Sequence, residues 1–313
     1  MRLAAVGLGM LGALAVSGGL AGAWSSSAEE KSASPAVSMQ VQASPTTWSC
    51  GPGPMSFNDM EAMPEGYLRP VRVGEGRPHQ FYLARAMYSE SYGGGGYWGG
   101  GGRSVGRDWA TDYPTADRVM TRIATRLSNL DACAWEFPVS LADPELRRYP
   151  FLYTVEWGRG ADLTDGEVEG LRSYLLAGGF LMVDDFWGTR EWESFEQQIR
   201  RVLPGHAIVE VPRDHAIFRS YYELDEEILQ VPNIRNGRSI TRGFPGARTS
   251  ERDGYEAHLR GIFDPNGRLI VAINWNTDLG DALEWAESPD YPLEYSTFAS
   301  RLFLNLIIYA MAY

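Results

Sequence analysis

Hydrophobic residues along the chain fall in short runs that alternate with longer amphipathic stretches. The clearest run is Phe180–Val183, which lies between the glycine pair 178–179 and the aspartates Asp184 and Asp185. A short run without polar alternation is typical of a parallel strand that is buried on both faces. In an open parallel sheet, ligands bind at the carboxyl ends of the strands. Asp184 and Asp185 are therefore expected to mark the functional edge.

Further apolar runs predict strands over residues 80–88, 132–139, 151–156 and 207–211, and a hairpin over 258–275. Apolar positions at helical spacing predict helices over 114–127, 164–177, 191–203 and 295–313, with a short helical turn at 143–145. Thr164 and Glu167 have the spacing of a capping box. Because strands alternate with helices, we predict an α/β protein with a doubly wound, mostly parallel sheet and a C-terminal hairpin and helix. The last helix is apolar nearly all round, which favours a buried cover of the sheet over a membrane or partner contact.

The N-terminus resembles a targeting segment. Arg2 precedes an uncharged stretch that ends in Ala21-Gly22-Ala23, the pattern of a cleaved secretory signal peptide. The alternative is an uncleaved membrane anchor, because the stretch is just long enough to span a bilayer. Both interpretations place the rest of the chain outside the cytoplasm, in a periplasm or a similar compartment. We predict three parts: a signal peptide or anchor at 1–23, a Ser/Ala/Pro-rich tether at 24–78, and an α/β domain at 79–313.

The net charge limits the classes of partner, and the cysteine content limits the number of disulfides. The net charge of −12 argues against nucleic acid and anionic membrane surfaces as partners. The two cysteines, Cys50 and Cys133, could form one disulfide in an oxidising compartment. Alternatively, Cys133 is a buried small hydrophobic residue. The sequence leaves both interpretations open.

The sequence lacks the motifs that are typical of enzymes with a serine or cysteine nucleophile. A Gly-x-Ser-x-Gly motif is absent, and neither cysteine lies in a strand-to-helix turn. The four histidines do not have the spacing of zinc ligands on a helix. We therefore predict no catalytic residue.

Five residues make up the candidate polar site: Asp184, Asp185, Glu156, Asp278 and His215. Adjacent residues of a strand point to opposite faces, so at most one of the two neighbouring aspartates is expected to reach a crevice. The carboxylates could bind a hard cation through oxygen. Alternatively, one of the two neighbouring aspartates caps the next helix and the other bonds a neighbouring loop. We favour the second interpretation, with a structural role for His215, and predict no metal and no cofactor.

Aromatic residues near the predicted strand ends are the candidate contacts with a partner. Eight of the ten residues 93–102 are glycine, and the Gly-x-Gly-x-x-Gly match in this stretch lacks the helix that must follow in a dinucleotide site. We interpret the stretch as a loop at the rim of the sheet. Aromatic side chains bring large contact areas to interfaces. The candidates are Tyr92, Tyr97, Trp98, Trp157, Trp187 and Trp275.

Five segments carry a resemblance to a known family: residues 109–114, 149–153, 178–188, 214–218 and 276–280. In this order they resemble the bacterial family of domains of unknown function numbered 4159, over residues 81–313. The resemblance implies a flavodoxin-like fold similar to class I glutamine amidotransferases and a setting in the cell envelope, without an established activity. Many members have Gly-His-Gly after the third strand, whereas this chain has Glu156-Trp157-Gly158. No role for that histidine is therefore implied here.

Two functions are consistent with these patterns. The first is a non-catalytic extracytoplasmic binding or scaffolding module, a subunit of a complex with an envelope or membrane protein. The alternative is an extracytoplasmic hydrolase-like or carbohydrate-binding domain that uses the acidic site at the strand ends.

Overall fold

The computed structural model describes residues 80–90, 108–224 and 228–313. All of these residues belong to one compact unit. The predicted signal peptide or anchor, the tether with Cys50, and the glycine-rich loop with Tyr92, Tyr97 and Trp98 lie outside the described residues. Within the described ranges, no helix is long and apolar enough to cross a membrane.

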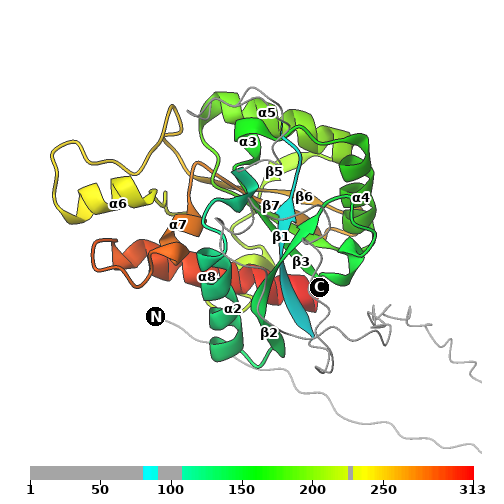
Figure 1. Ribbon diagram of the computed structural model, residues 1–313, viewed down its shortest axis with the longest axis horizontal. Coiled ribbons are helices and arrows are strands. Elements are labelled where there is room, and N and C mark those ends of the chain that lie inside the picture. Colours follow the sequence, from blue (N-terminus) through cyan, green and yellow to red (C-terminus); the bar gives the residue numbers. More distant parts are fainter. Residues whose placement is uncertain (1–79, 91–107, 225–227) are drawn as a thin grey trace, which may run out of the picture. The chain divides into compact units, whose positions relative to one another are not determined.

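Strands and helices alternate along the described chain (Figure 1). The strands are β1 (Phe81–Met87), β2 (Ala132–Ser140), β3 (Phe151–Val155), β4 (Phe180–Asp184), β5 (Ile208–Glu210), β6 (His258–Phe263) and β7 (Leu269–Trp275). The α-helices are α2 (Thr115–Leu127), α3 (Trp157–Gly160), α4 (Asp165–Leu176), α5 (Gly188–Val202), α6 (Ile234–Thr241), α7 (Leu279–Glu284) and α8 (Leu293–Ala312). The 3-10 turns are η1 (Asp108–Ala110), η2 (Leu146–Arg148) and η3 (Ala216–Phe218).

The described strands form a single sheet in the order β2-β1-β3-β4-β7-β6-β5. Strands β2, β1, β3, β4 and β7 run parallel to one another. Strand β6 runs antiparallel to β7, and β5 runs antiparallel to β6. The order of the strands reverses between β1 and β3, because β1 pairs with β2 on its other side. The predicted α/β class, with a mostly parallel sheet and a C-terminal hairpin and helix, is confirmed.

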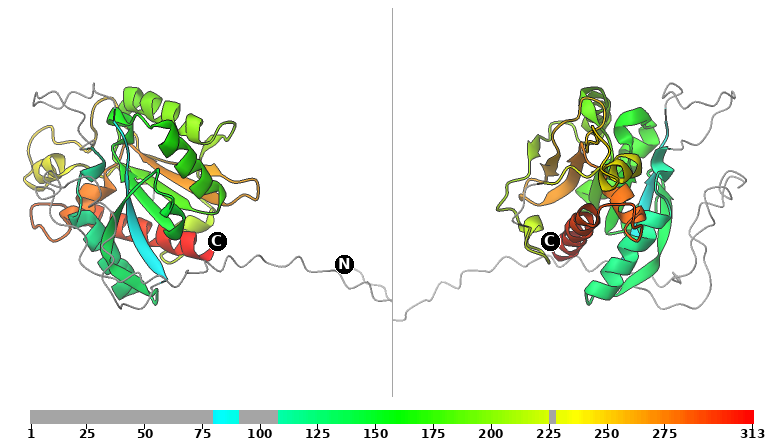
Figure 2. Two further views of the ribbon diagram at one scale, coloured as in Figure 1. Left: turned by 45° about the vertical axis from the view of Figure 1, so that its right-hand side comes forward. Right: turned by 90° about the vertical axis from the view of Figure 1, so that its left-hand side faces the viewer.

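Helices cover both faces of the sheet (Figure 2). Leu181 and Val183 of the central strand β4 join the hydrophobic cluster that contains residues of α4 and α5. Phe180 and Met182 join the cluster that contains residues of α2 and α8. All four side chains are fully buried. This alternation is what a strand covered on both faces requires.

The turn between α4 and β4 depends on two glycines. Gly178 has a φ of 100°, a left-handed conformation that ends the helix. A Cβ on Gly179 would lie 2.4 Å from the ring of Tyr174. The Tyr174 hydroxyl accepts a hydrogen bond from the Phe180 amide at 3.1 Å and donates one to the Phe180 carbonyl at 2.9 Å. The helix is therefore joined tightly to the start of β4, and the predicted Thr164–Glu167 capping box is confirmed at its other end.

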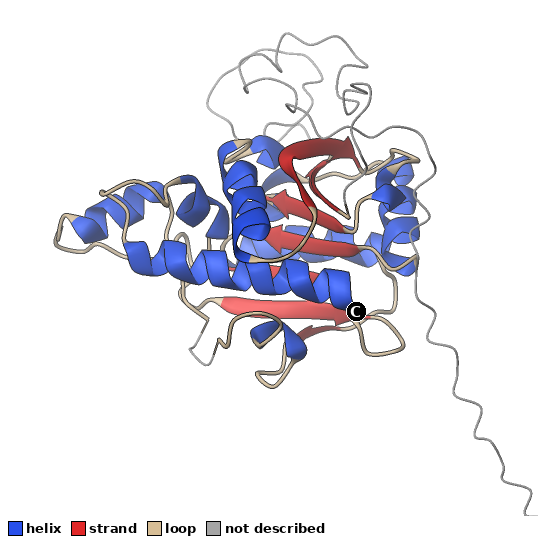
Figure 3. Ribbon diagram, turned by 90° about the horizontal axis from the view of Figure 1, so that it is seen from below, coloured by secondary structure: helices blue, strands red, loops and turns tan. Residues whose placement is uncertain are grey.

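Helix α8 lies along the sheet and ends at the C-terminus (Figure 3). Its side chains Phe298, Leu302 and Phe303 are buried against the sheet, so it has the predicted role of a cover. Asn305 is fully buried in this apolar helix. Its amide donates to the carbonyls of Ile217 and Tyr222, each at 2.8 Å, and thereby holds the segment around η3 against the helix.

Candidate functional site

Strands β3, β4 and β7 each lead directly into a polar residue with a left-handed backbone. These residues are Glu156 (φ 56°), Asp185 (φ 52°) and Asn276 (φ 60°). They expose 7%, 6% and 3% of their surface. A left-handed conformation in a non-glycine residue costs about 1–3 kcal/mol, and such residues cluster at functional sites. Three of them side by side identify the carboxyl edge of the sheet as the candidate site.

The two adjacent aspartates after β4 have different surroundings. Asp184 is fully buried, and its Oδ2 accepts hydrogen bonds from the Tyr153 hydroxyl at 3.1 Å and from the Gly280 amide at 3.0 Å. Asp185 turns away from that position, and its Oδ1 accepts a hydrogen bond from Trp187 Nε1 at 2.9 Å. Among the described residues, nothing donates to the other oxygen of Asp185. Asp184 therefore braces the structure through Oδ2, while its Oδ1, like the second oxygen of Asp185, accepts no hydrogen bond from the described residues.

Asp112 reaches this edge from the segment that joins β1 to α2. It has a φ of 62°. The buried guanidinium of Arg85 on β1 donates to the carbonyls of Trp109 at 3.2 Å and Thr111 at 3.0 Å, and it forms a buried salt bridge with Asp117. Arg85 thus fixes the backbone immediately before Asp112. The carboxyl group of Asp112 is buried, although part of the residue reaches solvent. Its Oδ2 accepts no hydrogen bond from any described residue.

Asp278 comes from the segment between β7 and α7 and caps that helix. Its Oδ1 accepts a hydrogen bond from the Asp281 amide at 2.7 Å. The residue exposes 2% of its surface. By contrast, neither Asp184 nor Asp185 caps the next helix, because the N-cap residue of α5 is Trp187 and no side chain caps it. The Asp278 carboxyl group also hydrogen-bonds with the carboxyl group of Asp281.

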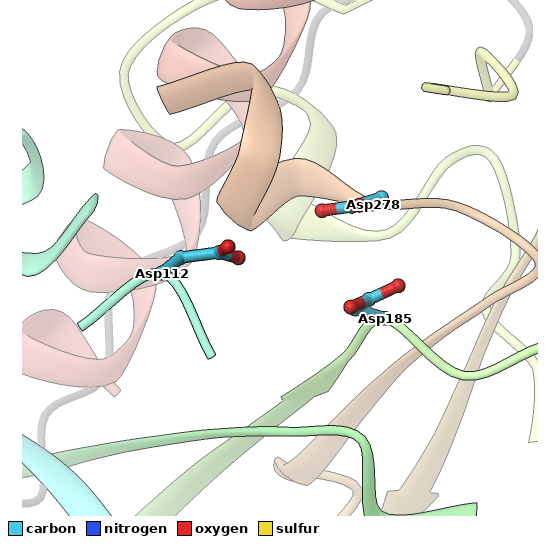
Figure 4. A group of neighbouring side chains, drawn as sticks. All are labelled: Asp112, Asp185 and Asp278. Carbon is cyan, nitrogen blue, oxygen red and sulfur yellow. The ribbon is translucent and has the colours of Figure 1, made fainter. Parts of the chain in front are cut away.

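The carboxylates of Asp112, Asp185 and Asp278 converge on one point (Figure 4). One oxygen of each lies within 4.8 Å of the other two. Asp112 also belongs to a second group with Asp281 and Glu284 that meets the same limit. The edge of the sheet thus brings five carboxylates together from three segments that are far apart in the sequence.

Burial dominates the electrostatics of this group. It raises the pKa of Asp112, Asp185 and Asp278 well above the ordinary range of a carboxyl, and the neighbouring carboxylates raise it further. Burial also raises the pKa of Asp184, to about 7, against the opposing effect of its hydrogen bonds. Buried like charges are expensive unless a cation or protons compensate them. The arrangement is therefore built to take up positive charge.

The remaining members of the predicted polar site divide between the two edges of the sheet. Glu156 forms an ion pair with Arg159, and its pKa is raised by burial and by Asp185, so it lies beside the group. His215 lies elsewhere: it packs against Phe263 and against Tyr309, whose hydroxyl accepts from the first amide of β7. That is the amino edge of the sheet, so His215 does not belong to the site.

The predicted aromatic contacts are corrected in part. Trp157 is fully buried between Tyr88 and Phe195, and Trp187 exposes only 2% of its surface. Neither indole is open to a partner, because each fills the core beside a strand end. Trp275 is partly buried and stacks on His258. Cys133 is buried and disulfide-bonded. Cys50 lies outside the described residues, so its part in that bond stays a prediction.

Sequence reasoning missed Asp112, Asp281 and Glu284. A signal for two of them was present, because Asp278, Asp281 and Glu284 follow one another at intervals of three residues. That spacing places the three side chains on one side of a helix. Asp112 had no comparable local signal.

The model of one protein family, described as Domain of unknown function (DUF4159), matches residues 99–311. No curated protein matches the chain. Asp112, Asp185 and Asp278 lie in three separate segments of the matched region, and each segment belongs to those that carry the sequence resemblance. The fold brings these three segments together at the candidate site.

Proposed function

We propose that this chain, which belongs to the DUF4159 family, is an extracytoplasmic domain that binds a hard divalent cation at the carboxyl edge of its sheet. Asp112, Asp185 and Asp278 are the protein ligands of this cation, and its remaining coordination positions take oxygens of water or of a bound molecule. We also propose that the fold is of the class I glutamine amidotransferase type. The chain then acts through its acidic site, the alternative among the two functions considered from the sequence.

The observation that carries this proposal is the convergence of three carboxylates. Protein oxygens lie about 2.3–2.6 Å from Ca²⁺, so two ligands of one ion are at most about 5 Å apart. The three oxygens of Asp112, Asp185 and Asp278 meet that limit, since they lie within 4.8 Å of one another.

An incomplete coordination shell supports a binding function. Ca²⁺ takes about six to eight oxygen ligands. Three carboxylates, each contributing one oxygen, leave several positions for water or for oxygens of a bound molecule, such as the hydroxyl groups of a glycan. We expect a dissociation constant on the order of 10⁻⁴–10⁻³ M, the range of extracellular calcium modules.

The scaffold hypothesis has less support from the described residues. It rested on aromatic side chains near the strand ends, and two of them, Trp157 and Trp187, are buried. Trp187 instead donates to Asp185 and orients that carboxylate. An envelope partner remains compatible with the proposal, because the cation would present a charged contact at the edge of the domain.

Isothermal titration of the metal-free full-length chain with CaCl₂ tests the proposal. We expect saturable binding that weakens at least about tenfold, or about 1.4 kcal/mol, in Asp185→Asn and in Asp278→Asn. Asp214→Asn is the matched control, because Asp214 is exposed beside His215, which lies at the opposite edge. The same titration with MgCl₂ measures the preference of the site for Ca²⁺ over the smaller Mg²⁺. Absence of Ca²⁺ binding, or equal binding by all four proteins, would overturn the proposal.

A further inference from the structure

A second group of carboxylates adjoins the proposed cation site and shares one residue with it. Single oxygens of Asp112, Asp281 and Glu284 lie within 4.8 Å of one another. Asp112 therefore takes part in both groups. Its carboxyl group is buried, and its Oδ2 has neither solvent contact nor a hydrogen-bond donor among the described residues. An enclosed carboxylate oxygen without a donor costs free energy unless a ligand or a proton meets it.

Helix α7 places its ligands in a row. Asp278 caps the helix, and Asp281 and Glu284 follow at intervals of three residues, which puts the three carboxyl groups on one side of the helix. Asp112 faces the start of this row: a Cβ on Gly280 would lie only 2.2 Å from its Oδ2. The glycine thus makes room for the carboxylate between the two groups.

The Asp281 carboxylate is held in a fixed orientation. Its Oδ2 accepts from the Ile234 amide at 2.7 Å, and its Oδ1 accepts from Trp285 Nε1 at 3.1 Å. Each carboxylate oxygen has a second lone pair. Such hydrogen bonds are the usual outer partners that orient the ligands of a metal ion.

The balance of charge also calls for more than one cation. The two groups together contain five carboxylates: Asp112, Asp185, Asp278, Asp281 and Glu284. The nearby positive charge of Arg85 is already paired with Asp117 in a buried salt bridge. Arg238, which lies near Asp281, stacks over the ring of Trp285. When all five carboxylates are ionised, one divalent cation leaves three of the five negative charges uncompensated, whereas two cations leave one.

We infer that the carboxyl edge holds a pair of divalent cations bridged by Asp112. The first cation lies between Asp112, Asp185 and Asp278, and the second between Asp112, Asp281 and Glu284. This inference rests on the proposed function, since it adds a position to the same site. Paired metal ions in proteins lie about 3.5–4 Å apart and share ligands.

Counting Mn²⁺ ions on the full-length chain tests the pair, because Mn²⁺ takes the same oxygen ligands. Native mass spectrometry and equilibrium dialysis should find two ions per chain at saturation. The electron paramagnetic resonance spectrum should show coupling between them. Glu284→Gln should lower the count from two to one and abolish the coupling. Asp112→Asn should weaken both positions.

Glu287→Gln is the matched control, because Glu287 is three residues further along and its side chain is 88% exposed. This variant should bind two coupled ions, like the wild type. Circular dichroism confirms that each variant is folded. A single ion in the wild-type chain, lost in Asp185→Asn, would overturn the pair and leave the proposed function standing. An unchanged count in Glu284→Gln would also overturn the pair. No bound ion at all would remove both proposals.

Discussion

The hydroxyl of Tyr153 lies 3.1 Å from Oδ2 of Asp184, in a part of the core that water does not reach. Tyr153 belongs to β3 and Asp184 to the end of β4, so the bond joins neighbouring strands just below the candidate site. The same oxygen accepts from the Gly280 amide. Asp184 thus connects both strands to the start of α7, the helix that Asp278 caps and that carries Asp281.

Replacing Tyr153 by Phe should destabilise the protein. A hydrogen bond to a charged group contributes about 1.5–3 kcal/mol, and its loss leaves a buried carboxylate with one donor fewer. Urea denaturation at pH 8 measures the effect. Tyr113→Phe is the control, because the Tyr113 hydroxyl is also buried but has no hydrogen-bond partner among the described residues. If Tyr153→Phe and Tyr113→Phe lose the same free energy of unfolding, the hydrogen bond from Tyr153 to Asp184 does not stabilise the protein.

The stability of the metal-free protein should fall as the pH rises. The pKa of Asp184 is raised to about 7, and those of Asp112, Asp185 and Asp278 are raised as well, by burial first. In the unfolded chain, carboxyl groups titrate at about pH 4. Each unit by which the pKa of a carboxyl group differs between the folded and the unfolded state changes the free energy of unfolding by about 1.4 kcal/mol. The folded state therefore binds more protons than the unfolded state above about pH 4, and this stabilisation is lost as the pH rises towards about 7 and beyond.

Thermal melting between about pH 5 and about pH 8, in EDTA and in CaCl₂, measures this dependence. The midpoint should decrease with pH in EDTA. It should hardly change in CaCl₂, because a bound cation stabilises the ionised carboxylates. A midpoint that increases with pH in EDTA would mean that these carboxylates are ionised without cost in the folded state.

Asp185→Asn should stabilise the metal-free protein while it weakens cation binding. The substitution keeps a side chain that tolerates the left-handed conformation at φ 52° and removes a buried charge. We expect a gain of about 1 kcal/mol, which corresponds to about 2–4 °C in the melting temperature of a domain of this size. The comparison is made in EDTA at pH 8. A lower melting temperature would indicate that Asp185 contributes to the fold rather than to a ligand site.

Leu181→Ala should cost about 2–5 kcal/mol, the usual range for a core leucine. Leu181 is fully buried in the central strand, whereas Leu176 exposes 58% of its surface at the end of α4. Leu176→Ala is the matched control, and it should change the stability by no more than about 0.5 kcal/mol. Chemical denaturation of both variants checks the prediction, and similar losses in the two would contradict the central position of β4.

The sheet could be predicted because each long element has its own local pattern. The period of the apolar positions separates Phe180–Val183 from the amphipathic helix α5, and the glycines 178–179 end the preceding helix. Helices α3, α6 and α7 were missed, because four to eight residues are too few for a periodic signal. Helix α5 begins at Gly188, three residues before its predicted start, since its first turn is polar apart from the glycine.

The candidate site could be predicted only in part. Asp185 follows β4 directly and Asp278 comes three residues after the end of β7, so the rule on carboxyl ends located them. The position of Asp112 depends on the hydrogen bonds that Arg85, 27 positions earlier in the sequence, donates to the carbonyls of Trp109 and Thr111. The burial of Trp157 and Trp187 depends on helix packing around them. No local pattern distinguishes an indole in the core from one at an interface.

Gly280→Ala should weaken cation binding without changing any charge. A Cβ at this position would lie 2.2 Å from Asp112 Oδ2 and 2.9 Å from the Tyr153 hydroxyl. Because both distances are shorter than a normal contact, the Asp112 carboxylate must move. The ligand oxygens would then no longer converge, and we expect the affinity for Ca²⁺ to fall at least about tenfold, or about 1.4 kcal/mol.

Gly166→Ala is the matched control for this substitution. Gly166 lies in the first turn of α4, and the nearest atom to an added Cβ there is 3.9 Å away, an ordinary contact. Alanine is favoured over glycine in helices by about 1 kcal/mol, so this variant should be slightly more stable and should bind Ca²⁺ like the wild type. Titration calorimetry well below the melting temperature separates binding from folding. If Gly280→Ala binds Ca²⁺ as tightly as Gly166→Ala does, Asp112 is not a ligand, and the cation site must be sought among the other carboxylates of the edge.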